Sequence, residues 1–346
     1  MREDNTVLIT GGAGFFGAIL KRYLLERGYR CVSVDLLEDP LRHSLLTSVT
    51  GDIGDKTLMQ GLFAEYRFRC VFHVAAILAH DRAHASRLWA SNVGATQSLV
   101  ELCETHHVRK IVFISSNCLW SKGFVRPVTE EDPPAPAERY GRSKLEAERI
   151  LQRHPDKVQT VILRCPTIID AGRMGLLTIL FDFIRENRRI WVIGGGRNRY
   201  QFVYAEDLAD ACLRSMQYKG SGVFHVGSDH VPMLSEVYQH IIDKARSSAR
   251  LHRLPRQPAL SVLRLCHRLG LSPLGPYHCK MIGENFIFST EKIKRELGWM
   301  PTLANAEMLY KAYAHYVHNP QPHGREVSPH SRPSSMGILR LVKWLS

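Results

Sequence analysis

Tyr140 and Lys144 lie four residues apart in the segment RYGRSKLEAE, which begins at Arg139. At this spacing two residues share one face of a helix and lie about one turn apart. A phenol has an ordinary pKa of about 10, and a neighbouring cation lowers it towards the range in which tyrosine exchanges protons at neutral pH. The same spacing is typical of two side chains that only pack along their stems. The position of the pair in the chain therefore has to decide between these interpretations.

A cluster of glycines follows the first strand-like segment of the chain. In VLITGGAGFFGAIL, Gly11, Gly12, Gly14 and Gly17 come directly after VLIT and at the start of a predicted helix. Glycines in this context permit a tight turn and a close approach of the backbone to a pyrophosphate, whose charge meets the N-terminus of the helix. The segment therefore predicts a dinucleotide-binding turn.

The second strand-like segment, CVSVD, ends in Asp35, about twenty residues after the glycine turn. A carboxylate there can accept hydrogen bonds from both hydroxyls of an adenosine ribose, and it would repel a 2′-phosphate. The sequence thus predicts NAD as the cofactor rather than NADP. Arg42 lies close enough in the sequence to reach a 2′-phosphate, and this alternative stays open.

Two later segments continue the same pattern. TGDIGD carries Asp52 and Ile53 at the end of the next strand-like run, where they are expected to flank the adenine. FHVAA follows another strand-like run, and its small residues Ala75 and Ala76 allow the backbone close to the cofactor. Each segment alone is weak evidence for a cofactor site. Their order after the glycine turn strengthens this evidence.

Short apolar runs alternate with helical patterns through the first half of the chain. The runs TVLIT, RCVSVD, CVFHVAA, KIVFISS and TVILR are separated by segments of helical periodicity. Continuous apolar runs joined by helices are typical of buried parallel strands with crossover helices. We therefore expect an α/β fold with a doubly wound parallel sheet, and a looser order of elements after Arg164.

The composition indicates the class and compartment of the protein. The chain has 346 residues, of which 45% are hydrophobic, and no apolar run reaches the roughly 18 residues that span a bilayer. The charged start MREDNT lacks the apolar region of a secretory signal. The eight cysteines form no Cys-x-x-Cys pair, so free thiols without a metal site are expected. Together these features predict a cytoplasmic protein.

The formal net charge of +13 raises the question of a polyanionic partner. The basic residues are mostly interleaved with acidic ones, as in KLEAERILQRHPDK, and the one strong local excess is DKARSSARLHRLPRQP. This scatter does not favour nucleic-acid binding. We expect the positive field to attract an anionic cofactor or substrate instead.

Three further features of the sequence belong to no recognised motif but allow expectations about structure. Residues 319–346 are rich in Pro, Ser and His and are expected to form a mobile basic tail. The last segment of this tail, MGILRLVKWLS, is amphipathic. It is expected either to dock on the protein or to touch a membrane or partner. The apolar segment LSVLRLCHRLGLSPLGPYH either packs internally or forms a hydrophobic wall for a substrate. His73 and His225 lie in apolar strand segments and are expected to be core histidines with hydrogen-bond partners.

Taken in order from about residue 7 to residue 318, these segments resemble the extended short-chain dehydrogenase/reductase family, the NAD-dependent epimerase/dehydratase group. The landmarks, in family order, are the glycine turn, Asp35, Asp52, HVAA, Asn92 in SNVGAT, FISSNCLW, YGRSK, LRCPT, FVYAEDLADA, FHVGS and ELGWMPT. Each landmark is modest, and the ordered set is specific.

The resemblance implies how the chain is divided. An NAD-binding Rossmann-type domain would comprise residues 1–165 and 199–226, and a smaller, discontinuous C-terminal substrate-binding lobe would comprise residues 166–198 and 227–318. The resemblance also implies a homodimer, formed through the helices that carry residues 86–106 and 143–153, and a small, sugar-like substrate bound between the two lobes.

The resemblance also assigns roles to individual residues. Tyr140 would be the catalytic base, Lys144 would lower its pKa and hold the nicotinamide ribose, and Ser116 would hydrogen-bond the reacting oxygen, with the adjacent Ser115 as fallback. The implied cofactor-binding residues are Gly11, Gly14, Phe15, Phe16, Gly17, Asp35, Asp52, Ile53, Ala75, Ala76, Asn92, Ser115, Tyr140, Lys144, Pro166 and Thr167. The residues expected to face the substrate are Ser116, Asn117, Arg197, Arg199 and Tyr200. No metal ion is expected.

Departures from the family pattern bear on the reaction. Dehydratases of the family carry an Asp–Glu pair where this chain has Asn117 and Cys118, so dehydration is disfavoured. Nucleotide-sugar enzymes usually have Asn in place of Thr167 and Arg in place of Tyr200, and both contact the diphosphate. Arg197 and Arg199 lie beside Tyr200, and a slip of one residue in the alignment would restore an arginine.

The sequence therefore predicts hydride transfer with NAD at a secondary alcohol or ketone, with epimerisation of a nucleotide-linked sugar as the leading reaction. The alternative enzyme is a net reductase or dehydrogenase acting on a non-nucleotide substrate such as an aminosugar, a cyclitol or a sterol-like alcohol. A hypothesis from another class is a non-catalytic NAD-binding scaffold, whose signature would be a lost Tyr or Lys. Both residues are present.

Overall fold

The computed structural model describes residues 5–77, 85–153, 155–269 and 282–319. Its centre is a sheet of seven strands in which every neighbouring pair is parallel. In spatial order the strands are β10 (Gly222–His225), β6 (Gln159–Cys165), β5 (Lys110–Ser116), β4 (Cys70–His73), β1 (Thr6–Thr10), β2 (Arg30–Asp35) and β3 (Leu46–Thr50).

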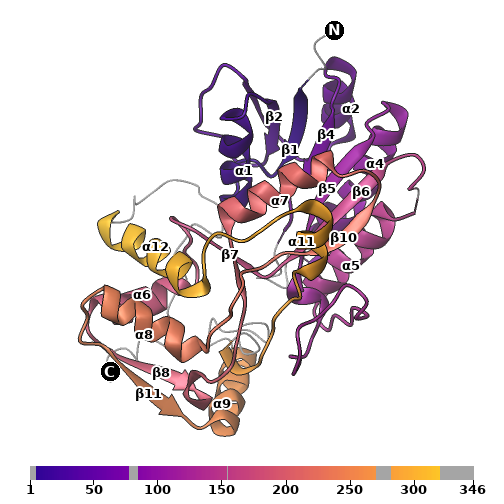
Figure 1. Ribbon diagram of the computed structural model, residues 1–346. Helices are drawn as coiled ribbons and strands as arrows, with labels where there is room; N and C mark the ends of the chain where they lie inside the picture. The colour runs from indigo at the N-terminus through magenta and orange to yellow at the C-terminus, as the bar shows by residue number, and fades with distance from the viewer. Residues whose placement is uncertain (1–4, 78–84, 154, 270–281, 320–346) are drawn as a thin grey trace.

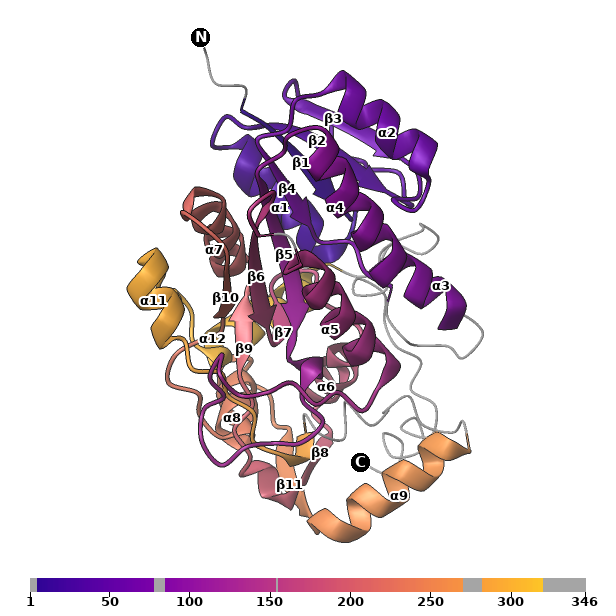
Figure 2. The ribbon, with the colours of Figure 1, turned by 90° about the vertical axis from the view of Figure 1, so that its right-hand side faces the viewer.

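Helices cover both faces of this sheet (Figures 1 and 2). On one face, α1 (Phe15–Leu25), α7 (Ala205–Gln217) and the short α11 (Glu291–Leu297) contribute to one apolar core with the sheet. On the other face, α2 (Lys56–Glu65), α4 (Ala95–Thr105) and α5 (Arg139–Leu151) contribute to a second core. Ahead of α4 lie α3 (Ala85–Trp89) and a π-helical turn (Ala90–Gly94). A parallel sheet with helices on both faces confirms the predicted doubly wound α/β fold.

The smaller lobe is built from segments that are far apart in the chain. Its core lies between α6 (Leu177–Arg185), α8 (Leu234–Lys244) and α12 (Asn305–His318). Two short parallel pairs accompany these helices: β7 (Thr167–Ile169) with β9 (Phe202–Tyr204), and β8 (Arg189–Ile193) with β11 (Arg250–Leu254). Two 3₁₀ turns (Asn117–Leu119 and Gly194–Gly196) and α9 (Arg256–Arg268) complete the described elements.

The predicted domain limits stay a prediction, and one segment packs differently from the expectation. The sequence assigns residues 227–318 to the substrate lobe, whereas Ile293 on α11 and Trp299 are buried in the core that α1 and α7 share with the sheet. The Trp299 indole N–H donates to the Asp207 carbonyl oxygen at 2.8 Å. The chain thus returns to the main sheet before it forms α12.

Several expectations fall on the limits of the described chain. The tail prediction concerns residues that, beyond Asn319, lie outside the described ranges, and so does the end of the apolar segment after Leu269. No helix within the described ranges is long and apolar enough to cross a bilayer. The described cysteines are free thiols, and the described residues contain no group of three or more His, Cys, Asp or Glu placed to hold a metal ion.

Candidate active site

The carboxyl ends of the parallel strands bring the predicted site residues to one edge of the sheet. The glycine turn follows β1, Asp35 ends β2, Ser116 ends β5 and Pro166 follows β6. Because β1 lies between β2 and β4, the residues predicted for adenosine lie to one side of the turn and those predicted for chemistry lie to the other. This crevice, where the strand order reverses, is the usual ligand position in such sheets.

Two glycines of the turn leave no room for a side chain. Gly11 has a φ of +76°, and a Cβ there would lie 2.8 Å from the backbone nitrogen and Cα of Ala75. A Cβ on Gly17 would lie 2.0 Å from the Gly11 carbonyl oxygen. No side chain caps the N-terminus of α1, whose first turn begins at Phe15. The turn therefore offers the backbone cradle and the helix N-terminus that a pyrophosphate requires.

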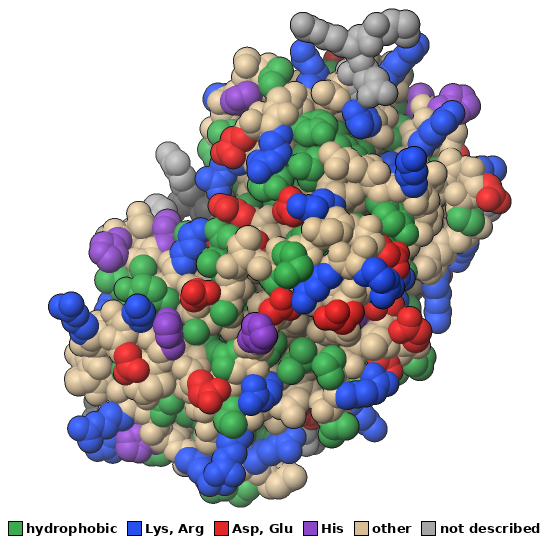
Figure 3. Space-filling model, viewed as in Figure 1, with side chains coloured by type: hydrophobic (Ala, Val, Ile, Leu, Met, Phe, Trp, Pro, Cys, Tyr) green, Lys and Arg blue, Asp and Glu red, His purple; other side chains and the backbone are tan. Residues whose placement is uncertain are grey.

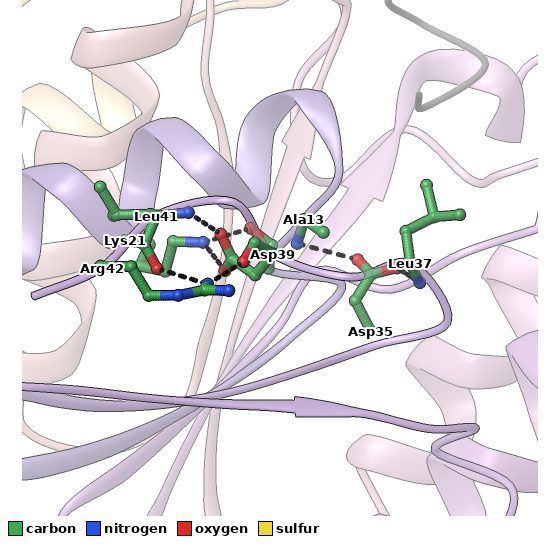
Figure 4. A network of polar contacts seen from close by, with 8 residues as sticks. Ala13, Lys21, Asp35, Leu37, Asp39, Leu41 and Arg42 are labelled. Atoms are coloured by element: carbon green, nitrogen blue, oxygen red, sulfur yellow. Dashed lines mark hydrogen bonds and ion pairs between the residues drawn. The ribbon is translucent and has the colours of Figure 1, made fainter. Parts of the chain in front are cut away.

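Asp35 is held in place by the backbone around it. Its carboxylate accepts hydrogen bonds from the N–H of Ala13 at 2.9 Å and the N–H of Leu37 at 3.0 Å. Arg42 donates to the carbonyl oxygens of Asp39 and Leu41 and, from its exposed side chain, to Glu38. Figure 4 shows Arg42 on the far side of Asp39 from Asp35. This orientation supports the choice of NAD over NADP that Asp35 indicated.

A buried ion pair beside the turn was not predicted from the sequence. The Lys21 side chain, 1% exposed, pairs with Asp39 and donates to the Gly12 carbonyl oxygen at 3.1 Å (Figure 4). Asp39 also accepts the N–H of Leu41 at 3.0 Å. The sequence did hold one signal for this pair, because Lys21 directly follows the buried Leu20 in an amphipathic helix. A lysine on the buried side of a helix requires a partner for its charge.

The residues predicted around the adenine and the pyrophosphate lie beside this network. Asp52 accepts the N–H of Gly54 at 2.8 Å in the turn after β3, and Ile53 is buried. Ala75 donates its N–H to the Thr10 hydroxyl at 3.3 Å, and Ala76 is exposed. The structure thus brings these four residues to the expected edge.

Helix α5 carries Tyr140, half-buried, and Lys144, which is 2% exposed. The Lys144 ammonium lies over the Phe113 ring, 4.0 Å from its centroid. Burial lowers the pKa of Lys144 to about 8, and the neighbouring Cys165 is the largest opposing influence. The protonated form therefore still dominates at neutral pH, and a cation stands one turn from Tyr140.

Gly141, at the start of α5, packs closely against the turn that follows β5. A Cβ on Gly141 would lie 2.3 Å from the Cys118 carbonyl oxygen. Gly141 thereby sets Tyr140 beside the 3₁₀ turn that follows Ser116. The glycine of the motif YGRSK thus allows the start of α5 to lie close to this turn.

The two adjacent serines take different directions. The buried Ser115 hydroxyl donates to Glu148, which pairs with Arg164 at 2.7 Å, so its predicted cofactor contact finds no support in this geometry. The half-buried Ser116 hydroxyl accepts the N–H of Cys118 at 3.1 Å. Successive strand residues point to opposite faces, and Ser116 is the serine left to face the crevice.

Asn92 and His73 link the elements around the pair. Asn92, buried in the π-helical turn, bonds the backbone of Ile77 at 2.8 and 3.0 Å and donates to the Ser143 hydroxyl at 3.1 Å. His73 contacts the hydroxyls of Thr10 and Thr96 at 2.8 and 2.9 Å. Burial lowers the pKa of His73 to about 3, which confirms a neutral core histidine.

His225 confirms the expectation of a core histidine in part. Burial, helped by Arg164, lowers its pKa to about 3, and its Nδ1 contacts the Val128 carbonyl oxygen at 3.1 Å. Among the described residues, its Nε2 has no hydrogen-bond partner.

The predicted substrate residues separate into two groups. Asn117 donates to the Tyr200 hydroxyl at 2.6 Å, and each side chain is 1% exposed. Arg199 instead donates to the Val231 carbonyl oxygen at 2.6 Å. The exposed Arg197 lines a cavity of about 360 Å³ together with Arg256 and residues 123–125, 193–194 and 283–285. Pro166 is buried, and the neighbouring Thr167 starts β7.

Sequence comparison relates most of the chain to known proteins. Residues 7–227 match the profile described as the NAD dependent epimerase/dehydratase family. An uncharacterized protein of Sinorhizobium fredii is 34% identical over 99% of this chain and 87% of its own length. A UDP-glucose 4-epimerase of Halalkalibacterium halodurans is 26% identical over 92% of this chain and 97% of its own length.

The fold also has close solved counterparts. The structure of a UDP-glucose 4-epimerase from Thermotoga maritima with UDP-glucose superposes with a TM-score of 0.75. It is 21% identical in sequence and covers 90% of this chain and 99% of its own. This likeness establishes the Rossmann-type fold.

Proposed function

The chain belongs to the NAD dependent epimerase/dehydratase family, and we propose that it catalyses hydride transfer with NAD at a secondary alcohol or ketone of a sugar-like substrate. The observation that carries this proposal is the buried, protonated Lys144 one turn from Tyr140, on a helix that Gly141 presses against the end of β5. Two side chains that only pack along their stems would not need a buried ammonium one helical turn from a half-buried tyrosine.

The residues present fit NAD as the cofactor. The turn from Gly11 to Gly17 and the N-terminus of α1 would hold the pyrophosphate, since a Cβ on Gly11 or on Gly17 would collide with backbone atoms and no side chain caps the helix. Asp35 would accept the adenosine ribose hydroxyls, with Asp52 and Ile53 beside the adenine. When bound, NAD accepts and returns the hydride.

The chemistry of the chain itself is proton transfer. The Tyr140 phenolate oxygen would take the proton from the substrate hydroxyl as the carbon is oxidised, and would return it on reduction. The positive charge of Lys144 favours the phenolate and so lowers the tyrosine pKa. The Ser116 hydroxyl would donate to the reacting oxygen and hold it in place.

Epimerisation of a nucleotide-linked sugar is the leading reaction. Dehydration is disfavoured because Asn117 and Cys118 offer no carboxylate where water elimination needs an additional acid and base. The Asn117 amide is moreover occupied by the Tyr200 hydroxyl. The relationship to UDP-glucose 4-epimerases supports this choice.

The Asn117–Tyr200 pair also favours a second candidate, a net reductase or dehydrogenase acting on a non-nucleotide alcohol. Tyr200 stands where nucleotide-sugar relatives carry an arginine, and its ring is buried against Phe202 and Phe286. Arg199 bonds to Val231 and does not replace that arginine. The one arginine of this segment on the cavity is Arg197.

A substrate panel separates these candidates. The purified chain would be incubated with UDP-, dTDP- and GDP-sugars, and separately with free aminosugars, cyclitols and sterols, while NADH absorbance and product are followed. An epimerase converts a nucleotide sugar without net NADH, whereas a dehydrogenase forms NADH in proportion to product. NAD binding without turnover of any class would contradict both and indicate the scaffold.

We further propose that the chain forms a homodimer through α4 and α5, which lie side by side over the sheet (Figure 2). Sedimentation equilibrium would give the mass of two chains, and a monomer mass would contradict this arrangement.

A further inference from the structure

The lower end of the molecule combines positive charge with exposed apolar side chains. Between Asp243 and Glu284 the sequence has eight Lys and Arg residues and no acidic residue. The described part of this stretch includes the end of α8, β11 and α9, and β11 pairs with β8. Figures 1 and 2 show these elements together at the lower end, and Figure 3 shows Lys and Arg side chains gathered along that edge.

The ribbon of β8 and β11 sets like charges beside one another. In its parallel register, Arg189 stands opposite Arg250, and the exposed Trp191 stands opposite His252, with ring centroids 5.2 Å apart. Like charges directly opposite each other on a sheet repel. Among the described residues, neither arginine forms an ion pair with a carboxylate. The ribbon therefore presents an unbalanced positive surface.

Helix α9 has an inner and an outer apolar side. Ala259, Leu260 and Leu263 pack with Ile193 and so attach the helix to β8. The outer stripe is formed by Val262, Leu265 and Leu269, which are 57%, 57% and 63% exposed. Val262 and Leu265 lie on α9, and Leu269 directly follows it with its N–H bonded to the Leu265 carbonyl oxygen at 3.1 Å. The three positions share one face at helical spacing, so the end of α9 offers solvent an apolar stripe.

We propose that this basic end, comprising the β8–β11 ribbon and the outer stripe of α9, binds the surface of an anionic lipid bilayer. The outer stripe would enter the boundary between headgroups and acyl chains, and Arg189, Arg250 and the exposed Arg256 at the start of α9 would contact lipid phosphates. A helix with an apolar face and arginines beside it is typical of interfacial attachment.

The chemistry of this end favours lipid over other partners. A nucleic acid would neutralise the arginines but would leave the leucines of the outer stripe in water. A second copy of the chain, meeting through the same surface, would bring arginine against arginine. An anionic bilayer satisfies both the charges and the apolar stripe.

The attachment goes beyond the proposed function and does not depend on it. Arg256 both begins α9 and lines the cavity that Arg197 shares. Attachment through α9 would thus bring the substrate lobe, rather than the cofactor turn, to the bilayer.

Cosedimentation of the full chain with vesicles tests the proposal. The chain is expected to bind vesicles of phosphatidylcholine mixed with phosphatidylserine, to bind phosphatidylcholine alone at least about tenfold more weakly, and to be released by high salt. Equal binding to both compositions, or no binding to either, would overturn it.

Substitutions test whether the vesicles bind at the outer stripe and the β8–β11 ribbon. Leu265→Ser is expected to weaken binding about tenfold, whereas Met300→Ser, which changes a side chain that is 59% exposed elsewhere, leaves it unchanged. The pair Arg189→Gln and Arg250→Gln should weaken binding about fivefold for each charge removed. The pair Arg67→Gln and Arg109→Gln removes the same charge from exposed positions outside this end and serves as its control.

The other partners give distinct results. If the outer-stripe and arginine variants bind vesicles as the unchanged chain does, attachment lies elsewhere and the proposal fails. Tight binding of an oligonucleotide that weakens with the arginine pair but not with Leu265→Ser would replace it with a nucleic-acid surface. A change in sedimentation mass on Leu265→Ser would assign the stripe to a second copy.

Discussion

Two buried polar pairs flank the crevice, and they differ in charge and in the parts of the molecule that they join. Lys21 and Asp39 form an ion pair within the cofactor half, between α1 and the loop after β2. Asn117 and Tyr200 form a neutral hydrogen bond between the end of β5 and the segment before β9. The first pair fixes the backbone around the glycine turn. The second ties the turn after β5 to the segment before β9, on the side where we propose that the substrate binds.

The difference indicates how the two halves are specialised. The cofactor half is shaped by backbone, since a side chain on Gly11 or Gly17 would collide with it, and the buried charge pair ties its loop down. The substrate half is shaped by large side chains, with Tyr200, Phe202 and Phe286 packed together. We therefore expect changes in the first half to affect stability and NAD binding together, and changes in the second to affect substrate alone.

Lys21→Met is expected to have the largest effect, because it leaves the Asp39 carboxylate buried beside an apolar side chain. Loss of one partner of a buried ion pair costs about 3–5 kcal/mol in the free energy of unfolding, which urea denaturation measures. Arg149→Met is the control, since Arg149 pairs with Glu146 at the surface of α5 and such pairs contribute about 0–1 kcal/mol. Equal losses for the two variants would remove the distinction between the halves.

Acid is expected to act on both halves through two neutral core histidines. Burial lowers the pKa of His73 and of His225 from 6.5 to about 3, so the unfolded chain binds protons that the folded chain excludes. Stability is therefore full above about pH 6.5 and falls as the pH drops towards 3, by about 2 kcal/mol for each histidine at pH 5.

Thermal unfolding across this pH range checks the sign of the effect. His73→Gln should reduce the dependence of the free energy of unfolding on pH by about half. His106→Gln changes an exposed histidine at the end of α4 and should leave this dependence unchanged. Stability that rises on acidification would contradict the burial of neutral histidines.

Gly17→Ala tests the backbone cradle directly. A Cβ 2.0 Å from the Gly11 carbonyl oxygen forces the turn to shift, which should destabilise the fold by about 1–3 kcal/mol and weaken NAD binding at least about tenfold. Gly61→Ala is the matched control, because a Cβ there meets nothing within 4 Å and should stabilise α2 by about 1 kcal/mol. Calorimetry with NAD measures both variants, and effects of the same sign would count against the cradle.

Tyr200→Phe is expected to have the smallest effect on stability, about 1 kcal/mol for one hydrogen bond to Asn117. Since the pair lies on the substrate side, KM for the substrate should change while the Kd for NAD stays constant. Steady-state kinetics measures KM for the substrate, and an NAD titration measures the Kd for NAD. A parallel loss of NAD affinity would show that the two halves are coupled.

The parts of the site that the sequence predicted are those encoded locally. The glycine turn, Asp35 and the Tyr140–Lys144 spacing each lie in one short segment whose strand–turn–helix context is visible in the residues. The doubly wound sheet followed from apolar runs alternating with helical patterns, and the structure confirms it.

The remaining features depend on contacts between distant segments. The partner of Lys21 lies on a loop 18 residues away, and the Asn117–Tyr200 bond joins positions 83 residues apart. The direction of Arg199 is set by the Val231 carbonyl oxygen, and that of Ser115 by Glu148. Composition and spacing carry no information about such tertiary pairs, so the sequence left these alternatives open.

The kcat of Tyr140→Phe, measured at saturating NAD with the substrate that the panel identifies, tests the proposed proton transfer most directly. The variant keeps the ring and removes only the phenolic oxygen, so kcat should fall about 10²–10⁴-fold while the Kd for NAD stays within a few-fold. Tyr310→Phe on α12 is the matched control and should retain full turnover. Turnover of Tyr140→Phe equal to that of the control would contradict the assignment of Tyr140 as the proton-transfer residue.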